Sequence, residues 1–224
     1  MACPALTFAN DLKNIFPSGL CGIIFDCDGV MIDSAAANRY LYNTVLGALG
    51  LPPITPAQEK FAFQATFQQA LEHLVPKALH PKMEAAVRDN VDYDLDIVPK
   101  ITLMPGYREF ITAAHAHGLK LAMDTNRTDA GARKILEHFH LPSWFSPVIS
   151  ATLAEPKPSP QGAVRICHEW DVLPVQALFV GDSPDDKLAA EGARVVFCGF
   201  GGIEGELMVN SWHELAVLLW GREI

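Results

Sequence analysis

One stretch of this chain restricts its fold more than any other: an apolar run at residues 22–25 stops at two aspartates, Asp26 and Asp28, followed by Gly29. Continuous apolar runs of this kind are typical of strands buried on both faces of a parallel sheet. In open α/β sheets, ligands bind just beyond the carboxyl ends of the strands. Two carboxylates at such a position are costly to desolvate unless a cation or a proton compensates their charge. The stretch therefore predicts a site that holds a metal ion, a shared proton, or both.

The second half of the chain alternates between helical patterns and short apolar strands. Beyond Gly106 we expect strands at 120–123, 147–150, 177–180 and 195–197. Between them, apolar residues at helical spacing indicate helices at 107–117, at 129–139 and in a segment that ends near Trp170. Strands that alternate with helices predict βαβ units and a parallel sheet covered on both faces. The expected fold class is α/β, with a doubly wound, Rossmann-like core.

The segment from residue 33 to residue 100 contains helical signals and no convincing strand. One helix is expected to begin at Pro56, because Thr55 and Gln58 match a capping box and proline is favoured at the first helical position. Apolar residues at helical spacing extend this pattern to Leu74. The segment therefore predicts an all-helical insertion.

This insertion divides the chain into two predicted domains. The α-helical cap domain spans 33–100, and the Rossmann-like catalytic core combines 1–32 with 101–224. Two further helical patterns belong to the cap, one ending at Gly50 and one at about 81–91. We expect hinges where the chain passes between the domains, and closure of the cap to exclude bulk water from a crevice.

Composition and charge argue against several kinds of partner. The net charge is -9, whereas binding of nucleic acid needs clustered lysine and arginine. No apolar run approaches the length that spans a membrane, and the N-terminal residues lack the pattern of a signal peptide. The five cysteines are scattered without CxxC pairs, which favours free thiols in a reducing compartment. We therefore expect a cytoplasmic monomer or homodimer with no nucleic-acid or membrane partner.

Polar residues follow four of the predicted strands or lie in the adjoining loops. They are Asp26 and Asp28, Thr125 and Asn126, Lys157, and Asp182 with Asp186. In a doubly wound sheet such residues converge on one crevice. Three or four carboxylates supply the hard oxygen ligands that suit Mg²⁺, and a hydroxyl, backbone N–H groups and a lysine supply donors for a phosphoryl group. One aspartate can act as a nucleophile, and a second can transfer protons.

These residues carry a resemblance to a known family. The motifs are Asp26-Cys27-Asp28-Gly29-Val30, Thr125-Asn126, Lys157-Pro158 and Gly181-Asp182-Ser183-x-x-Asp186. In order and spacing they resemble the four signature motifs of the haloacid dehalogenase-like hydrolase superfamily. The helical insertion after the first motif resembles the subgroup that contains phosphoglycolate phosphatase and β-phosphoglucomutase. With the βα pattern around the motifs, the resemblance extends over nearly the whole chain.

The resemblance implies a role for each catalytic and phosphate-binding residue. Asp26 is the expected nucleophile, and Asp28 is the expected general acid and base. Lys157 is expected to neutralise the nucleophile and the transferring phosphoryl group. Thr125 is expected to hold a phosphoryl oxygen, with help from the backbone of Asn126.

The resemblance also implies a magnesium site. Asp26 and Asp182 are expected to ligate Mg²⁺ through their side chains, and Asp28 through its backbone carbonyl. Asp186 is expected to hold a metal-bound water or to orient the site. Its neighbour Asp185 is an alternative for this last role, although the motif favours Asp186.

Some residues depart from the family pattern or allow two interpretations. Asp124 stands where the family more often has a small or apolar residue, and it either adds negative charge near the metal or caps the following helix. A stiffer backbone is expected before Lys157, because Glu155-Pro156 replaces a common glycine. Arg39, Lys60 and Arg127 are candidates for contacting the substrate beyond its phosphate, with solvated surface charge as the alternative.

The motif set favours an enzyme, a Mg²⁺-dependent phosphatase that hydrolyses a small phosphorylated metabolite through an aspartyl-phosphate. The expected substrate is phosphoglycolate-like or sugar-phosphate-like. Asp28 favours phosphate chemistry over carbon–halogen cleavage, because an alkoxide leaving group benefits from protonation. Two alternatives stay open: a β-phosphoglucomutase-like mutase that uses the same core residues, and a non-catalytic phospho-ligand-binding protein, which would not require Asp28.

Overall fold

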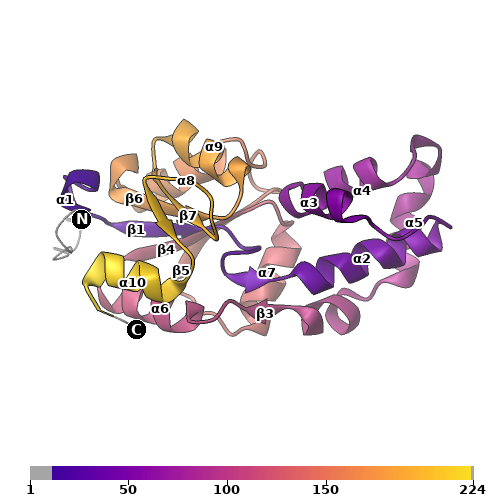
Figure 1. The fold of residues 1–224 in the computed structure, drawn as a ribbon, viewed down its shortest axis with the longest axis horizontal. Coiled ribbons are helices and arrows are strands. Elements are labelled where there is room, and N and C mark those ends of the chain that lie inside the picture. Colours follow the sequence, from indigo (N-terminus) through magenta and orange to yellow (C-terminus); the bar gives the residue numbers. More distant parts are fainter. Residues whose placement is uncertain (1–11, 223–224) are drawn as a thin grey trace. The chain divides into compact units, whose positions relative to one another are not determined.

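The computed structural model describes residues 12–222 (Figure 1). The chain divides into two compact units, one made of Met1–Met31 and Leu103–Ile224 and the other of Ile32–Thr102. We describe each unit by itself. The first contains the large sheet and the predicted site residues, and the second is mainly helical.

A six-stranded sheet forms the centre of the first unit, in the order β5-β4-β1-β6-β7-β8. Every neighbouring pair in it is parallel. The strands are β1 (Gly22–Phe25), β4 (Lys120–Thr125), β5 (Phe145–Ser150), β6 (Ala177–Gly181), β7 (Val196–Phe200) and β8 (Leu207–Val209). The predicted doubly wound parallel sheet is confirmed, with β1 at the point where the strand order changes direction. The short edge strand β8 was not predicted.

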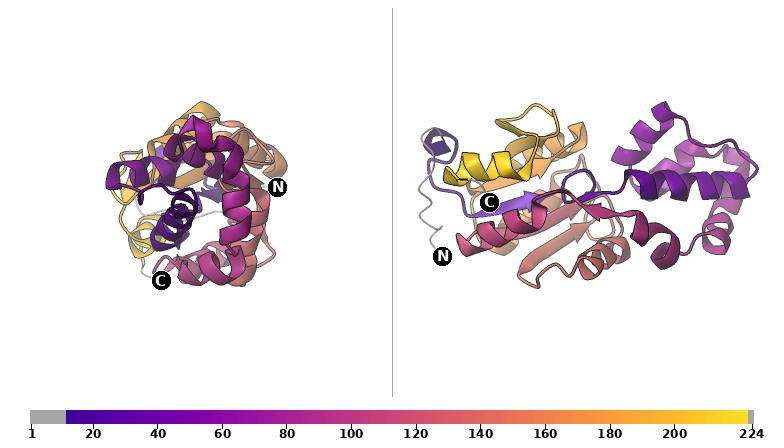
Figure 2. Two further views of the ribbon diagram at one scale, coloured as in Figure 1. Left: turned by 90° about the vertical axis from the view of Figure 1, so that its right-hand side faces the viewer. Right: turned by 60° about the horizontal axis from the view of Figure 1, so that its bottom comes forward.

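Helices cover both faces of this sheet, because successive side chains of a strand point to opposite faces (Figures 1 and 2). On one face Ile24 belongs to an apolar cluster with residues of α8 (Gln161–Trp170) and α9 (Pro184–Ala193). On the other face the ring of Phe25 packs against the rings of α6 (Tyr107–Ala116) and α10 (Trp212–Trp220). The remaining helices of this unit are α1 (Leu12–Ile15) and α7 (Asp129–His138).

The second unit consists of short helices, and one prediction for it is wrong. Its elements are α2 (Ala35–Ala48), α3 (Pro56–Gln64), α4 (Phe67–Leu74), α5 (Met83–Asn90) and the short helical segments Lys77–Lys82, Tyr93–Ile97 and Val98–Lys100. The helix predicted to run from Pro56 to Leu74 breaks at Ala65, whose backbone is extended. Thr66 then starts a second helix through its own capping box with Gln69. The short strands β2 (Ile32–Asp33) and β3 (Thr102–Leu103) pair with each other.

The cysteines agree only in part with the expectation of free thiols. Cys27, Cys167 and Cys198 are free and buried. Cys21 is disulfide-bonded, so the expectation is wrong at this position. Scattered spacing alone cannot exclude a pairing between positions that the fold brings together. Within residues 12–222, the helices are too short or too polar to cross a membrane.

Candidate active site

Predicted site residues from three strands lie at one edge of the sheet. Since β1 pairs with both β4 and β6, Asp26, Thr125 and Asp182 lie at the ends of adjacent strands. The backbone N–H of Asp26 continues the pairing by donating to the carbonyl of Val180, at 3.0 Å. The strand order changes direction at β1, and this is where open α/β sheets bind ligands.

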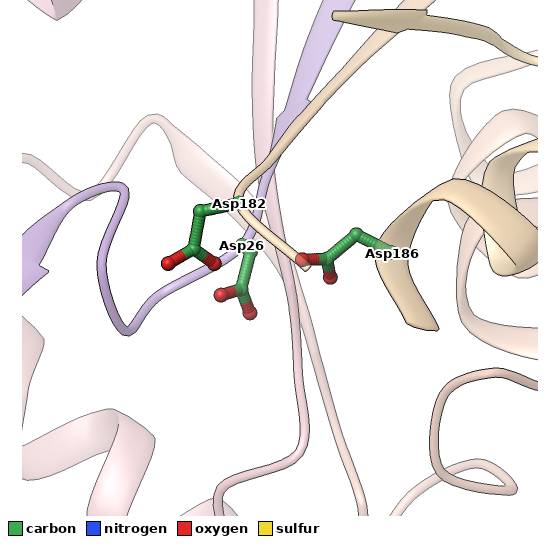
Figure 3. A group of neighbouring side chains, drawn as sticks. All are labelled: Asp26, Asp182 and Asp186. Carbon is green, nitrogen blue, oxygen red and sulfur yellow. The ribbon is translucent and has the colours of Figure 1, made fainter. Parts of the chain in front are cut away.

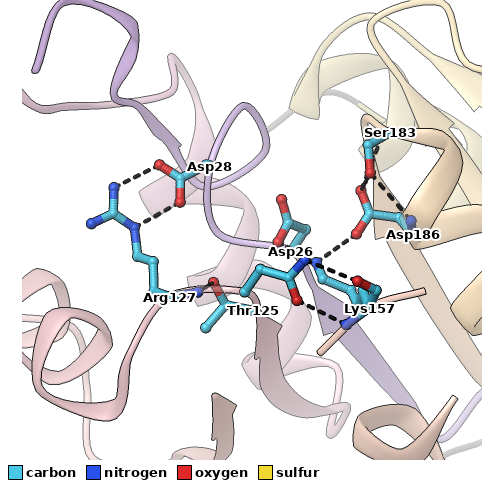
Figure 4. Close-up of polar contacts among 8 residues, drawn as sticks. Asp26, Asp28, Thr125, Arg127, Lys157, Ser183 and Asp186 are labelled. Carbon is cyan, nitrogen blue, oxygen red and sulfur yellow. Dashed lines mark hydrogen bonds and ion pairs between the residues drawn. The ribbon is translucent and has the colours of Figure 1, made fainter. Parts of the chain in front are cut away.

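Lys157 joins two carboxylates, that of Asp26 after β1 and that of Asp186 on α9 (Pro184–Ala193). Its Nζ donates to Oδ1 of Asp26 and to Oδ1 of Asp186, each at 2.5 Å (Figure 4). Burial lowers the pKa of Lys157, but the charges of Asp186 and Asp26 outweigh this and raise it well above its ordinary value. The ammonium group is therefore charged and compensates two buried carboxylates.

The loop that carries Lys157 is held by the side chain of Asn126. Asn126 Oδ1 accepts a hydrogen bond from the backbone N–H of Lys157 at 2.8 Å, and its Nδ2 donates to the carbonyl of Lys157 at 3.1 Å. Thr125, one residue earlier, is buried, and its Oγ1 accepts from the backbone N–H of Arg127 at 3.1 Å. The structure thus gives Asn126 a positioning contact, in addition to the phosphate contact that was predicted for its backbone.

Asp186 uses both of its carboxylate oxygens inside the protein. Oδ1 accepts from Lys157, and Oδ2 accepts from the backbone N–H and the hydroxyl of Ser183, at 3.0 and 2.6 Å. Ser183 and Asp186 form the capping box of α9. Gly181 is required here, because a Cβ at this position would lie 2.3 Å from the Cβ of Asp186. Asp186 is consequently fixed in place, and its neighbour Asp185 makes none of these contacts.

Three carboxylates converge at the strand ends in an arrangement that could hold a metal ion. One oxygen each from Asp26, Asp182 and Asp186 lies within 4.8 Å of the others (Figure 3). Burial raises the pKa of Asp26 well above its ordinary value. The charge of Lys157 lowers this pKa, and the neighbouring carboxylates raise it further. Burial and the charge of Asp186 raise the pKa of Asp182 to about 7. These hard oxygen donors fit Mg²⁺, because a divalent cation would compensate the negative charge of the buried carboxylates.

Asp28 points away from this cluster and pairs with Arg127 (Figure 4). Arg127 Nε donates to Asp28 Oδ2 at 2.7 Å, and Arg127 Nη2 donates to Asp28 Oδ1 at 2.6 Å. The two aspartates of the first motif therefore have different partners, Lys157 for Asp26 and Arg127 for Asp28. Solvated surface charge, the alternative for Arg127, is wrong, because 13% of its side chain is exposed.

Comparison with known proteins identifies the family. The family model described as haloacid dehalogenase-like hydrolase matches residues 23–200, which include every predicted site residue. The chain belongs to the haloacid dehalogenase-like hydrolase family. The predicted resemblance is thereby confirmed.

Individual relatives of this haloacid dehalogenase-like hydrolase cover most of its length. A phosphoglycolate phosphatase from Chromobacterium violaceum is 28% identical over 88% of this chain and 95% of the relative. Another phosphoglycolate phosphatase, from Nitrosospira multiformis, is 27% identical over 82% of this chain and 84% of the relative. The crystal structure of a HAD-superfamily hydrolase (subfamily IA, variant 1) from Geobacter sulfurreducens has a TM-score of 0.72 and 30% identity, covering 89% of this chain and 96% of that one.

Asp124 is a buried carboxylate of this hydrolase for which the sequence left two interpretations. It does not cap the following helix, because the hydroxyl of Thr128 does so by accepting from the backbone N–H of Gly131. Its carboxylate instead lies against α8, where a Cβ at Gly162 would be 2.2 Å from Oδ1. Burial raises the pKa of Asp124 to about 6, although Lys157 lowers it. The helix cap is therefore wrong for Asp124, whereas its interpretation as added negative charge near a metal stays a prediction.

Two functional contacts of the hydrolase were missed at the level of sequence. Ser183 was named only as a member of the fourth motif, with no role of its own, yet it holds Asp186. The capping-box spacing of Ser183 and Asp186 was a signal that could have predicted this contact. The pairing of Arg127 with Asp28 had no comparable signal, because the two residues are distant in sequence.

Proposed function

We propose that this hydrolase is a Mg²⁺-dependent phosphatase that acts on a small phosphorylated metabolite through an aspartyl-phosphate intermediate. The observation that carries the proposal is the different environment of the two aspartates two residues apart. Asp26 is buried against Lys157, whereas Asp28 points to Arg127. Pairs of carboxylates in different environments are a common basis for separate catalytic roles. The names of the curated relatives support phosphoglycolate-like esters as substrates.

In the proposed first step, an oxygen of Asp26 attacks the phosphorus of the ester. The bond from phosphorus to the alkoxide breaks, and Asp28 donates a proton to the departing oxygen. In the second step, water attacks the phosphorus of the acyl-phosphate while Asp28 takes its proton. Inorganic phosphate leaves, and Asp26 is regenerated.

Other side chains of the site orient the reacting groups. Lys157 neutralises negative charge on the phosphoryl oxygens as it does on Asp26, and the Thr125 hydroxyl with the backbone of Asn126 supplies further donors. Asp26, Asp182 and the backbone carbonyl of Asp28 are the proposed holders of Mg²⁺. Asp186, whose two oxygens accept hydrogen bonds from Lys157 and Ser183, would hold a metal-bound water or orient the site. The ion supplies positive charge that stabilises the transferring phosphoryl group.

The helical segment 33–100 is the proposed cap, with 1–32 and 101–224 as the catalytic core. Substrate choice is assigned to the cap together with the rim of the core. A cytoplasmic location and a monomeric or homodimeric state remain predictions.

Phosphate release tests the proposed function. We would measure inorganic phosphate from 2-phosphoglycolate and a panel of sugar phosphates, with Mg²⁺ and with EDTA. The expected result is Mg²⁺-dependent release that falls by at least about 10⁴-fold in Asp26→Asn, because removal of a nucleophile leaves only residual catalysis. Release by Asp26→Asn at the wild-type rate would overturn the mechanism. Isomerisation of a sugar phosphate without release of phosphate would support a mutase instead.

A further inference from the structure

We infer that Arg127 determines specificity by binding a second anionic group, a carboxylate, on the phosphorylated substrate. On binding, Arg127 exchanges the carboxylate of Asp28 for that of the substrate and so releases Asp28. The inference rests on the proposed phosphatase function and names the substrate class: phosphate esters that carry a carboxylate close to the ester oxygen.

The geometry of the pair is that of carboxylate recognition. Two N–H groups of one guanidinium meet the two oxygens of one carboxylate, at 2.7 and 2.6 Å. Arginine presents a planar fork that matches a carboxylate, and such paired charge-assisted hydrogen bonds are among the stronger ones in proteins. The structure therefore already shows that Arg127 is placed to bind a carboxylate.

The same contact removes Asp28 from proton transfer. Both oxygens of Asp28 accept hydrogen bonds from Arg127, so its carboxylate is held in an ion pair. A general acid must reach the oxygen that receives its proton. Release from Arg127 frees the side chain of Asp28 to move, and the carboxylate of the substrate then takes its place on Arg127.

An exchange of one carboxylate for another keeps Arg127 paired. Its guanidinium has an anionic partner before and after the exchange, so the charge of the arginine stays compensated. The pair is partly open, with 13% of the Arg127 side chain and 19% of the Asp28 side chain exposed. In contrast, Lys157 is nearly fully buried between Asp26 and Asp186 and is not available for such an exchange.

The sequence positions of Arg127 and Asp28 agree with a site for the end of the substrate that does not carry the phosphate. Arg127 lies two residues beyond Thr125, and Asp28 lies two residues beyond Asp26. In Figure 4 the Arg127–Asp28 pair lies on one side of the site, and the contacts of Lys157 lie on the other. The inference places the phosphoryl group at Asp26 and Lys157 and the carboxylate of the substrate at Arg127.

Binding of two matched phosphonates tests the inference without turnover. The probes are 3-phosphonopropionate, which resembles 2-phosphoglycolate, and propylphosphonate, in which a methyl group replaces the carboxylate. In calorimetric titrations with Mg²⁺ present, the wild type is expected to bind 3-phosphonopropionate about 10- to 100-fold more tightly than propylphosphonate. Arg127→Met is expected to lose most of this preference. No preference in the wild type, or the same preference in the variant, would overturn the inference.

The comparison has two internal controls. A folding defect in Arg127→Met would weaken both phosphonates together and leave their ratio unchanged. Arg133→Met removes an exposed arginine of α7 that pairs with Asp129, and it should keep the wild-type ratio.

Turnover separates this inference from the proposed function. The ratio of kcat/KM for 2-phosphoglycolate to that for ethyl phosphate should fall about 10- to 100-fold in Arg127→Met. If the wild type hydrolyses both esters equally well, the phosphatase function stands and the role of Arg127 fails. If the wild type hydrolyses neither ester nor any other on the panel, the phosphatase function fails.

Discussion

The carboxylate of Asp182 lies directly against the backbone of Gly29: a Cβ at Gly29 would be 1.9 Å from Asp182 Oδ2. Gly29 also has a φ of +80°, which side chains other than glycine rarely adopt. The turn after the first motif therefore leaves room for the carboxylate that comes from the end of β6.

Gly29→Ala should displace Asp182 and weaken Mg²⁺ binding. Gly201→Ala is a matched control, because Gly201 has a φ of +67° and a Cβ at this position would meet no other atom within 4 Å. Backbone strain alone should lower the free energy of unfolding of both variants by about 1 kcal/mol. Calorimetric titration with Mg²⁺ should show weakened binding only for Gly29→Ala. Equal Mg²⁺ affinities for the two variants would contradict the role of this contact.

Asp186→Asn should lose activity, whereas Asp185→Asn should keep it. An amide at residue 186 would direct its NH₂ group at either Lys157 or Ser183, both of which donate hydrogen bonds to the carboxylate. The resulting displacement is expected to reduce kcat/KM by about 100-fold. Asp185 makes no contact with Lys157 or Ser183, so its variant should stay within about threefold of the wild type. The reverse ranking in phosphate release would assign the role to Asp185.

Lys157→Met should destabilise the protein in a pH-dependent way. Removal of one partner from a buried ion pair costs about 3–5 kcal/mol, because Asp26 and Asp186 would lose their compensating charge. The loss of stability should be largest at pH 7.5 and smaller at pH 5, because burial raises the pKa of Asp26 and this carboxylate takes up a proton more readily at the lower pH. Urea unfolding of the wild type and the variant at both pH values measures the difference in their free energies of unfolding. Lys187→Met, on α9, should change the free energy of unfolding by less than about 0.5 kcal/mol.

The Asp124→Asn variant should gain stability relative to the wild type as the pH rises. The pKa of Asp124 is about 6 in the folded protein, above the ordinary value of 3.8. The folded state therefore binds the proton more tightly, and wild-type stability falls as the pH rises between these values. The free energy of unfolding of the variant, relative to the wild type, should rise by about 2 kcal/mol from pH 4.5 to pH 7.5. A difference that does not vary with pH would contradict the raised pKa.

The elements that hold the motifs were predictable because each has a local signal. The apolar run before Asp26 marks a buried strand, and the strands that end near Thr125 and Asp182 have the same pattern. The order of these residues along the chain and the alternation of strands with helices then indicate which carboxylates meet. The break at Ala65 was not predicted, because the apolar spacing continues across it and only the second capping box at Thr66 marks it.

Contacts between side chains that are far apart along the chain could not be predicted from the sequence. Nothing near Asp28 indicates that Arg127 reaches it, since the pairing depends on how the loops after β1 and β4 are arranged. Similarly, Asp124 was expected near its own helix or near the metal, but burial places it against Gly162 of α8. In both cases tertiary packing, which has no local pattern, decides the partner.

The central position of β1 has a consequence for synthesis on the ribosome. β1 is the first strand of the sheet to be made, yet its two neighbours are β4 and β6, and β6 begins only at Ala177. At ordinary elongation rates, one edge of this apolar strand stays open for on the order of ten seconds. An open apolar edge is a template for pairing with other chains. Nascent chains arrested before β6 should therefore aggregate or recruit chaperones, and release of the full-length chain should coincide with completion of the sheet.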